Sequence, residues 1–169
     1  MKEAICIIPS HGYILFSKCP IHKCVIVSFD LRNFKAGATH AIHIHEFGDF
    51  SDGCKSLGPH YNPTNETHGS IDFPDKPRHA GDLINNFTTN DSGDFIHSYI
   101  DDKLSEVDFN DIYGRSIVIH DGIDDLGRGT GKDKAESLKT GNAGTRLACG
   151  IIRRKGWGLY ELFYLNNVK

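Results

Sequence analysis

The chain contains no apolar run long enough to span a bilayer, and its first residues, MKEAICIIPS, place an acidic residue and only a short apolar patch before Pro9. We therefore expect no transmembrane segment, no signal peptide, no membrane partner, and a cytoplasmic location. Positive charge is not in excess either, since 19 Lys and Arg face 22 Asp and Glu for a net charge of −3. This balance argues against nucleic acid as a partner but allows a local positive patch.

Internal repeats, low-complexity segments and linkers are absent too, so residues 1–169 are predicted to form one domain. Helical patterning is confined to a short polar segment, residues 132–138. Eighteen glycines and alternating apolar residues favour an all-β fold with long connections, including a hairpin around residues 90–93. Eight strands are predicted at Ala4–Ile8, Gly12–Phe16, Lys23–Leu31, a run through His43 and His45, Asp82–Phe87, Asp94–Ile100, Ser116–His120 and Thr145–Ile152.

Histidine is concentrated in residues 40–82, which hold six of the ten histidines. His43 and His45 alternate with isoleucines, so on a strand both imidazoles point to one face and can chelate a metal ion. The segment that follows is rich in Gly, Pro and Asn and adds further ligand-type side chains at His60, His68, His79 and Asp82. Such a loop is ordered more easily by metal than by an apolar core.

Two metals suit this donor set. Three histidines and a carboxylate favour a closed tetrahedral zinc site, whereas several imidazoles in a tetragonal arrangement favour copper. The ligands are too many for one ion.

Five linked sequence blocks carry a resemblance to a known family. They are HIHEFGD, GCKSLGPHYNP, HAGDL, GRSIVIHDGIDDLG and KTGNAGTRLACG. With these blocks in order, the chain resembles the copper–zinc superoxide dismutases from Ala4 to Ile152; one HxH alone would be weak support, but five ordered blocks are specific. The resemblance implies an eight-stranded Greek-key β-barrel or sandwich with two long loops, one metal-binding and one electrostatic.

The resemblance also implies the ligands of two metals. Copper would be held by His43, His45, His60 and His120. Zinc would be held by His60, His68, His79 and Asp82. His60 would bridge both ions, since each nitrogen of a fully deprotonated imidazole can bind one.

Further roles follow from the same resemblance. Asp124 would hydrogen-bond one histidine ligand of each metal. The alternative is that Asp124 and Asp125 are an ordinary pair of solvent-exposed acidic residues. Arg146 would receive an anionic substrate beside copper, and Lys139 would add weakly to its steering.

Cysteine offers two candidate pairs. Cys54 and Cys149 occupy the positions of the family's intrachain disulfide, although two reduced thiols are the alternative for a cytoplasmic chain. Cys19 and Cys24, with His22 between them, are either an ordinary hairpin connection or a second small metal site or labile disulfide. Cys6 is expected to be a buried strand residue.

The C-terminus departs from the resemblance, because residues 153–169 form an extension. Its aromatic part, residues 157–165, is expected to add a strand or a lid. Arg153 and Arg154 replace small or apolar residues of the family's dimer contact, while Phe47 and Gly48 keep its other features, so a homodimer would have an altered interface. Similar tails occur in superoxide dismutase-like proteins of some large DNA viruses, which would place the chain in the host cytoplasm or the virion.

The function that the resemblance implies is dismutation of superoxide to oxygen and hydrogen peroxide, as antioxidant defence, with one copper and one zinc ion per subunit. His60 would also carry a proton, and a copper chaperone is an implied partner. The alternative is a non-catalytic decoy that binds metal or a copper chaperone. Such a decoy would need neither His120 nor Arg146.

Overall fold

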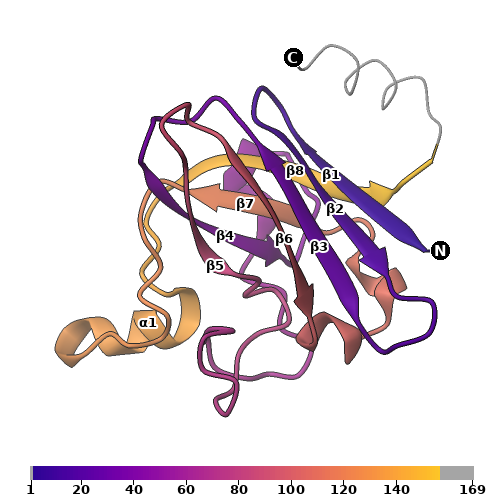
Figure 1. The fold of residues 1–169 in the computed structure, drawn as a ribbon. Coiled ribbons are helices and arrows are strands. Elements are labelled where there is room, and N and C mark those ends of the chain that lie inside the picture. The colour runs from indigo at the N-terminus through magenta and orange to yellow at the C-terminus, as the bar shows by residue number, and fades with distance from the viewer. Residues whose placement is uncertain (1, 157–169) are drawn as a thin grey trace.

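Alternating apolar residues build an eight-stranded antiparallel sheet in the computed structural model, which describes residues 2–156 (Figure 1). The order across the sheet is β5-β4-β7-β8-β1-β2-β3-β6, so the connections from β3 to β4 and from β6 to β7 run between distant strands in Greek-key fashion. The predicted all-β barrel is confirmed. Its strands are β1 (Glu3–Ile8), β2 (Gly12–Lys18), β3 (Val25–Leu31), β4 (Thr39–His45), β5 (Asn85–Thr88), β6 (Phe95–Asp101), β7 (Ser116–His120) and β8 (Arg146–Arg154).

The core lies between the two halves of the curled sheet. In β3, Val27 and Phe29 are buried, whereas Ile26, which precedes Val27 in the chain, points to the opposite, outer face of the sheet. The alternation in the sequence predicts this arrangement. Cys6 is buried as expected, and burial raises the pKa of its thiol to about 12. The two ends of the strand order meet through side chains, since the rings of Phe87 and Phe95 have centroids 5.1 Å apart.

Two sequence predictions about β5 are wrong. The turn at residues 90–93 exists, with Asn90 N donating to Asp94 O at 2.9 Å, but β5 and β6 are not hydrogen-bonded neighbours. Turn chemistry specifies a reversal but not which strands pair, and here β5 pairs with β4. In addition, β5 begins at Asn85 rather than at residue 82, because Leu83 has φ of 22°, which interrupts extended backbone.

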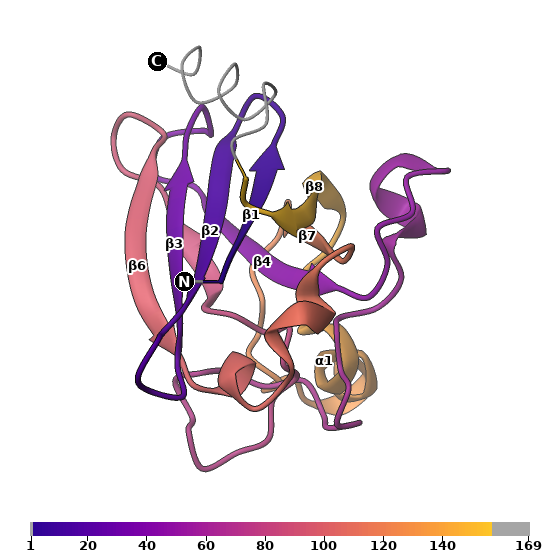
Figure 2. The same cartoon turned by 90° about the vertical axis from the view of Figure 1, so that its right-hand side faces the viewer.

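Two long connections leave the barrel at the same end (Figures 1 and 2). The β4–β5 connection contains only a short 3₁₀-helix, Gly53–Leu57, and the β7–β8 connection contains α1 (Lys134–Thr140), close to the predicted polar helix. Among residues 2–156, no helix is both long and apolar enough to cross a membrane. The strand or lid expected at residues 157–165 lies outside the described residues.

Disulfides join both candidate cysteine pairs. Cys54–Cys149 ties the 3₁₀-helix of the β4–β5 connection to β8, and Cys19–Cys24 closes the connection between β2 and β3. The first bond therefore fixes a long loop to the barrel, whereas the second links two residues that are already neighbours in a hairpin.

Candidate metal centre

Four histidines converge beside β4 and β7. His43 and His45 project from β4 on the face opposite the core residues Ile42 and Ile44, as predicted. His120 ends β7, and His60 is brought in by a single bridge between its backbone and that of His45. One ring nitrogen from each of these four histidines lies within 4.8 Å of those of the others.

A β-bulge aims His120 at this group. Ile119 pairs with Ala148, but the next residue, His120, pairs with Arg146, so Leu147 is an extra residue in β8 and is 47% exposed. The bulge makes His120 and Arg146 direct cross-strand neighbours. It also brings His120 Nε2 to 3.4 Å from His45 Nε2.

A second group gathers around one carboxylate oxygen. Asp82 Oδ1 lies 3.0, 2.9 and 3.1 Å from the Nδ1 atoms of His60, His68 and His79. Its other oxygen accepts the backbone N–H groups of Gly69 and His79, which fixes the carboxylate. Ligand atoms of a tetrahedral zinc ion lie about 3.3 Å apart, so this spacing fits zinc.

Two buried ring nitrogens of the four-histidine group lack partners within residues 2–156. Among the described residues, the buried His43 Nδ1 and His60 Nε2 have no hydrogen-bond partner. His60 directs Nδ1 toward Asp82, so Nε2 is left for the four-histidine group. A buried polar atom without a partner is costly, and a metal ion supplies the partner. Imidazoles alone suit copper, and three imidazoles with a carboxylate suit zinc.

Burial keeps the four-histidine group neutral. It lowers the pKa of His43 and, together with the nearby His60, lowers that of His45 well below the usual value. It also lowers the pKa of His120 to about 4 and, with His43, that of His60 to about 3. Neutral imidazole is the form that binds metal, so these ligands need not first lose an acidic proton.

His68 behaves in the opposite way. Burial lowers its pKa, but hydrogen bonds to Asp124 and Asp82 outweigh burial and raise the pKa to about 9. The imidazolium is sandwiched between two carboxylates at 2.9 Å from each. A zinc ion held at His68 would displace this proton.

Asp124 connects the two groups. Its carboxylate lies 2.6 Å from His43 Nε2 and 2.9 Å from His68 Nε2. Burial opposes its ionisation, but these hydrogen bonds hold the pKa of Asp124 well below its usual range. Because one carboxylate orients a histidine of each group, Asp124 has the position that the resemblance gives it rather than that of a solvated surface acid.

Arg146 borders a cavity of about 360 Å³ that opens beside the four-histidine group. Its guanidinium donates to the carbonyls of Cys54 at 2.7 Å and Gly58 at 2.6 Å, so it is held in place. Lys139 is exposed on α1 and does not line this cavity. The lining residues are His45, Pro59, His60, His120, Glu136, Thr140, Asn142, Ala143, Gly144 and Arg146.

Sequence reasoning missed the residues that support the ligands. His40 Nδ1 lies 3.0 Å from His120 O, Asn85 donates to Asp124 Oδ2 at 3.0 Å, and Asn86 exchanges two hydrogen bonds with the Asp124 backbone. Gly141 has φ of 66°, and a Cβ there would overlap the Asp124 carboxylate. The glycine in KTGNAG, Gly141, could have indicated in the sequence a position without room for a side chain. Asn85 and Asn86 gave no comparable indication.

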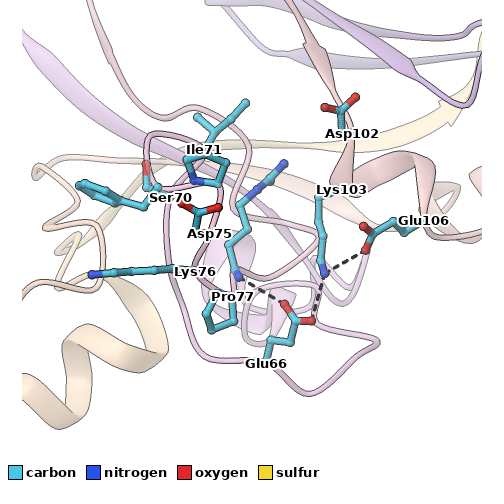
Figure 3. Close-up of a pocket in the computed structure, with 12 residues that line it drawn as sticks. Glu66, Ser70, Ile71, Asp75, Lys76, Pro77, Asp102, Lys103 and Glu106 are labelled. Carbon is cyan, nitrogen blue, oxygen red and sulfur yellow. Dashed lines mark hydrogen bonds and ion pairs between the residues drawn. The ribbon is translucent and has the colours of Figure 1, made fainter.

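A second cavity, of about 350 Å³, lies under the loop that precedes His79 (Figure 3). Lys103 Nζ lies 3.0 Å from both Glu66 and Glu106, and the backbone N–H of Arg78 donates to Glu66 (Figure 3). Lys103 is thus paired with two of the acidic residues that line the cavity. These contacts fasten the loop to the segment after β6, and this cavity is not part of the metal centre.

Fold and site together define a class: a β-barrel protein with two groups of side chains that could each hold a metal ion and that share the His60 imidazole. A family model described as copper/zinc superoxide dismutase (SODC) matches residues 10–152. Relatives named superoxide dismutase [Cu-Zn] are 43% identical in Cryptococcus neoformans var. grubii (84% of this chain, 88% of the relative), 45% in Schizosaccharomyces pombe and 43% in Saccharomyces cerevisiae (83% and 88% for both). The chain belongs to the copper/zinc superoxide dismutase family.

Replacing Asp124 by Asn should weaken zinc binding roughly 10–100-fold, since the amide nitrogen cannot accept from a ring N–H and His68 loses its orientation. Titration of the purified protein against a zinc chelator measures this change. Asp121→Asn, at an exposed neighbouring carboxylate, is the control and should keep the original affinity. Equal zinc affinities for the two variants would contradict the bridging role.

Proposed function

We propose that this chain converts superoxide to oxygen and hydrogen peroxide with the residue roles given below. It is a copper- and zinc-binding oxidoreductase of the superoxide dismutase type. The observation that carries this function is the pairing of two donor groups, joined by His60, with a cavity that is lined by His45, His60 and His120 of the four-histidine group.

His43, His45, His60 and His120 would hold copper, and His60, His68, His79 and Asp82 would hold zinc. When bound, copper supplies one-electron redox chemistry, which takes an electron from one superoxide and gives an electron to another, while zinc holds the loop and the His60 ring. The net reaction consumes two superoxide ions and two protons. The roles of the protein's own side chains are therefore to attract the anion, orient it and deliver protons.

Arg146 binds and orients superoxide. Hydrogen bonds to three carbonyl groups, those of Cys54, Lys55 and Gly58, leave donor capacity on Nε and Nη2 of the guanidinium. A guanidinium that is always charged and already fixed in place can bind a small anion without losing further side-chain entropy. The local positive charge of Arg146 attracts the anion although the whole chain has a net charge of −3.

His60 moves a proton at Nε2. This atom is buried, lacks a hydrogen-bond partner among the described residues, and belongs to a ring that lines the cavity. Asp82 holds the opposite nitrogen and so fixes the ring orientation. A proton taken up at Nε2 is therefore positioned next to the anion bound by Arg146, and can be transferred to the peroxide that forms.

Replacing His120 by Ala should abolish dismutase activity, because the four-histidine group loses the ligand that faces His45 across 3.4 Å. Activity is measured with copper and zinc quantified on the same sample. His97→Ala, at an exposed histidine of β6, is the control and should retain full activity and metal content. A fully copper-loaded wild-type protein without activity would instead favour the non-catalytic decoy.

Replacing Arg146 by Ala should lower kcat/KM roughly tenfold and weaken its dependence on ionic strength, because steering of an anion by a local charge is screened by salt. Arg146→Lys keeps the positive charge but loses the forked donor geometry of the guanidinium. Its kcat/KM should lie between those of the wild type and Arg146→Ala. Lys139→Gln, at an exposed lysine outside the cavity lining, should change the rate little. If Lys139→Gln lowers kcat/KM as much as Arg146→Ala with metal content intact, the roles assigned to the two side chains are wrong.

We also propose a homodimer with an altered interface, formed by the face that carries Phe47, which is 51% exposed, and Phe50. Gly48 packs its Cα against the Gly114 carbonyl, where a side chain would not fit. Arg153 and Arg154 are exposed at the end of β8 and add charge to this edge. Sedimentation velocity should find a dimer that Phe47→Glu dissociates; a wild-type monomer at all accessible concentrations would contradict it.

Copper loading by a copper chaperone and a cytoplasmic location are the remaining proposals, and both rest on family membership. Copper content of the protein from cells with and without a copper chaperone tests the first. Cell fractionation tests the second.

A further inference from the structure

The tip of the β2–β3 hairpin carries the Cys19–Cys24 disulfide, which the dismutase reaction does not use. The hairpin projects from the side of the barrel away from α1 (Figure 1). The β2–β3 ladder extends to Lys18 opposite Val25, and beyond it Cys19 N donates to Cys24 O at 3.0 Å. The backbone therefore holds the two cysteines together whether or not their sulfurs are bonded.

The two disulfides of the chain differ in what they stabilise. Cys54–Cys149 spans a sequence separation of 95, and Cys149 is buried against Leu57 and Val118. Cys19–Cys24 spans a separation of only 5. Because the stabilisation by a disulfide grows with the length of the loop that it closes, the hairpin bond contributes less to the fold.

The hairpin bond is also more accessible. Cys19 and Cys24 are half-buried, and all four residues between them, 20–23, are exposed. Attack on a disulfide requires access to one of its sulfurs. The exposed loop provides this access, whereas the apolar cluster around Cys149 restricts it.

Two lysines flank the hairpin bond. Residues 17–24 contain Lys18 and Lys23 and no acidic residue, while from neighbouring segments Asp108 interacts with Lys18 and Glu3 accepts a hydrogen bond from Ser17. Cationic neighbours stabilise a thiolate, and a thiol of lower pKa is the better leaving group in exchange. The same charges attract an anionic thiol.

We propose that Cys19–Cys24 is a reversible site of thiol–disulfide exchange with an anionic low-molecular-mass thiol of the glutathione class. The attacking thiolate forms a bond to one cysteine sulfur, and the S–S bond breaks to release the other cysteine as a thiolate. A second molecule of the thiol then displaces the first. The products are two cysteine thiols and the disulfide of the small thiol, and the reverse reaction with that disulfide restores the bond.

The test equilibrates the metal-loaded protein with buffers of reduced and oxidised glutathione. After acid quench, free thiols are alkylated with a mass label, and each cysteine pair is quantified by peptide mass spectrometry. Cys19–Cys24 should be reduced at least roughly tenfold faster than Cys54–Cys149, and oxidised glutathione should restore it. Zinc content and dismutase rate should stay unchanged throughout, which separates this proposal from the proposed function.

Charge variants test the recognition of the thiol. Replacing Lys18 and Lys23 together by Gln should slow reduction by glutathione about two- to threefold and slow reduction by 2-mercaptoethanol less, because both thiols lose the better leaving group but only glutathione carries further negative charge beyond its thiolate. Cys19→Ser and Cys24→Ser should each keep the fold and the metals. Reduction of Cys19–Cys24 no faster than that of Cys54–Cys149, or unfolding of both serine variants, would show that the bond is a structural link and overturn the proposal.

Discussion

Two buried carboxylates, Asp82 and Asp124, are the interactions on which the rest of this structure depends. Six imidazoles are packed in one region of the protein, and each carries two polar nitrogens that must find partners out of water. Asp82 gathers three Nδ1 atoms, and Asp124 joins His43 to His68. The carboxylates come from different long connections, so they also fix these two connections to each other.

The long connections need such fixing because they contain little regular structure. Ordering each residue of a loop costs about 1–2 kcal/mol of backbone entropy, and residues 46–84 bury few apolar side chains in return. A structural zinc site couples metal binding to folding, and a disulfide that closes a long loop lowers the entropy of the unfolded chain. We therefore expect zinc and Cys54–Cys149 to contribute to the ordering of this segment.

Much of the fold could be predicted from the sequence because strand periodicity is local. The alternation around His43 and His45 predicted their shared face, and the burial of Ile42 and Ile44 confirms it. Pairing is a long-range property, which is why the turn at residues 90–93 was mistaken for a hairpin. The bulge at Leu147 could not be predicted either, since one extra residue in a strand leaves no mark in a pattern of alternating polarity.

The site shows the same division. Ligand-type residues are conspicuous in a sequence, so candidate donors could be predicted, but the groups that support them are asparagines, a glycine and backbone carbonyls that resemble ordinary loop residues. Asn85 and Asn86 hold Asp124 only because the chain returns to β5 next to the end of β7, a contact between residues 38 or 39 positions apart. Such contacts depend on topology and become visible only in three dimensions.

The Gly58 carbonyl couples the Arg146 guanidinium to the four-histidine group. It lies 2.9 Å from His45 Nδ1 and accepts from Arg146 Nη2 at 2.6 Å, so one peptide group orients both a donor of the four-histidine group and the guanidinium. The carbonyl of Cys54 holds the same guanidinium, and Cys54 is fixed in turn by its disulfide to β8. Loss of the disulfide would therefore loosen Arg146 first, because the guanidinium depends on this loop for all of its backbone contacts, whereas His43 and His120 are held by strands. The position of the Arg146 guanidinium is thus more sensitive to the disulfide than the positions of His43 and His120.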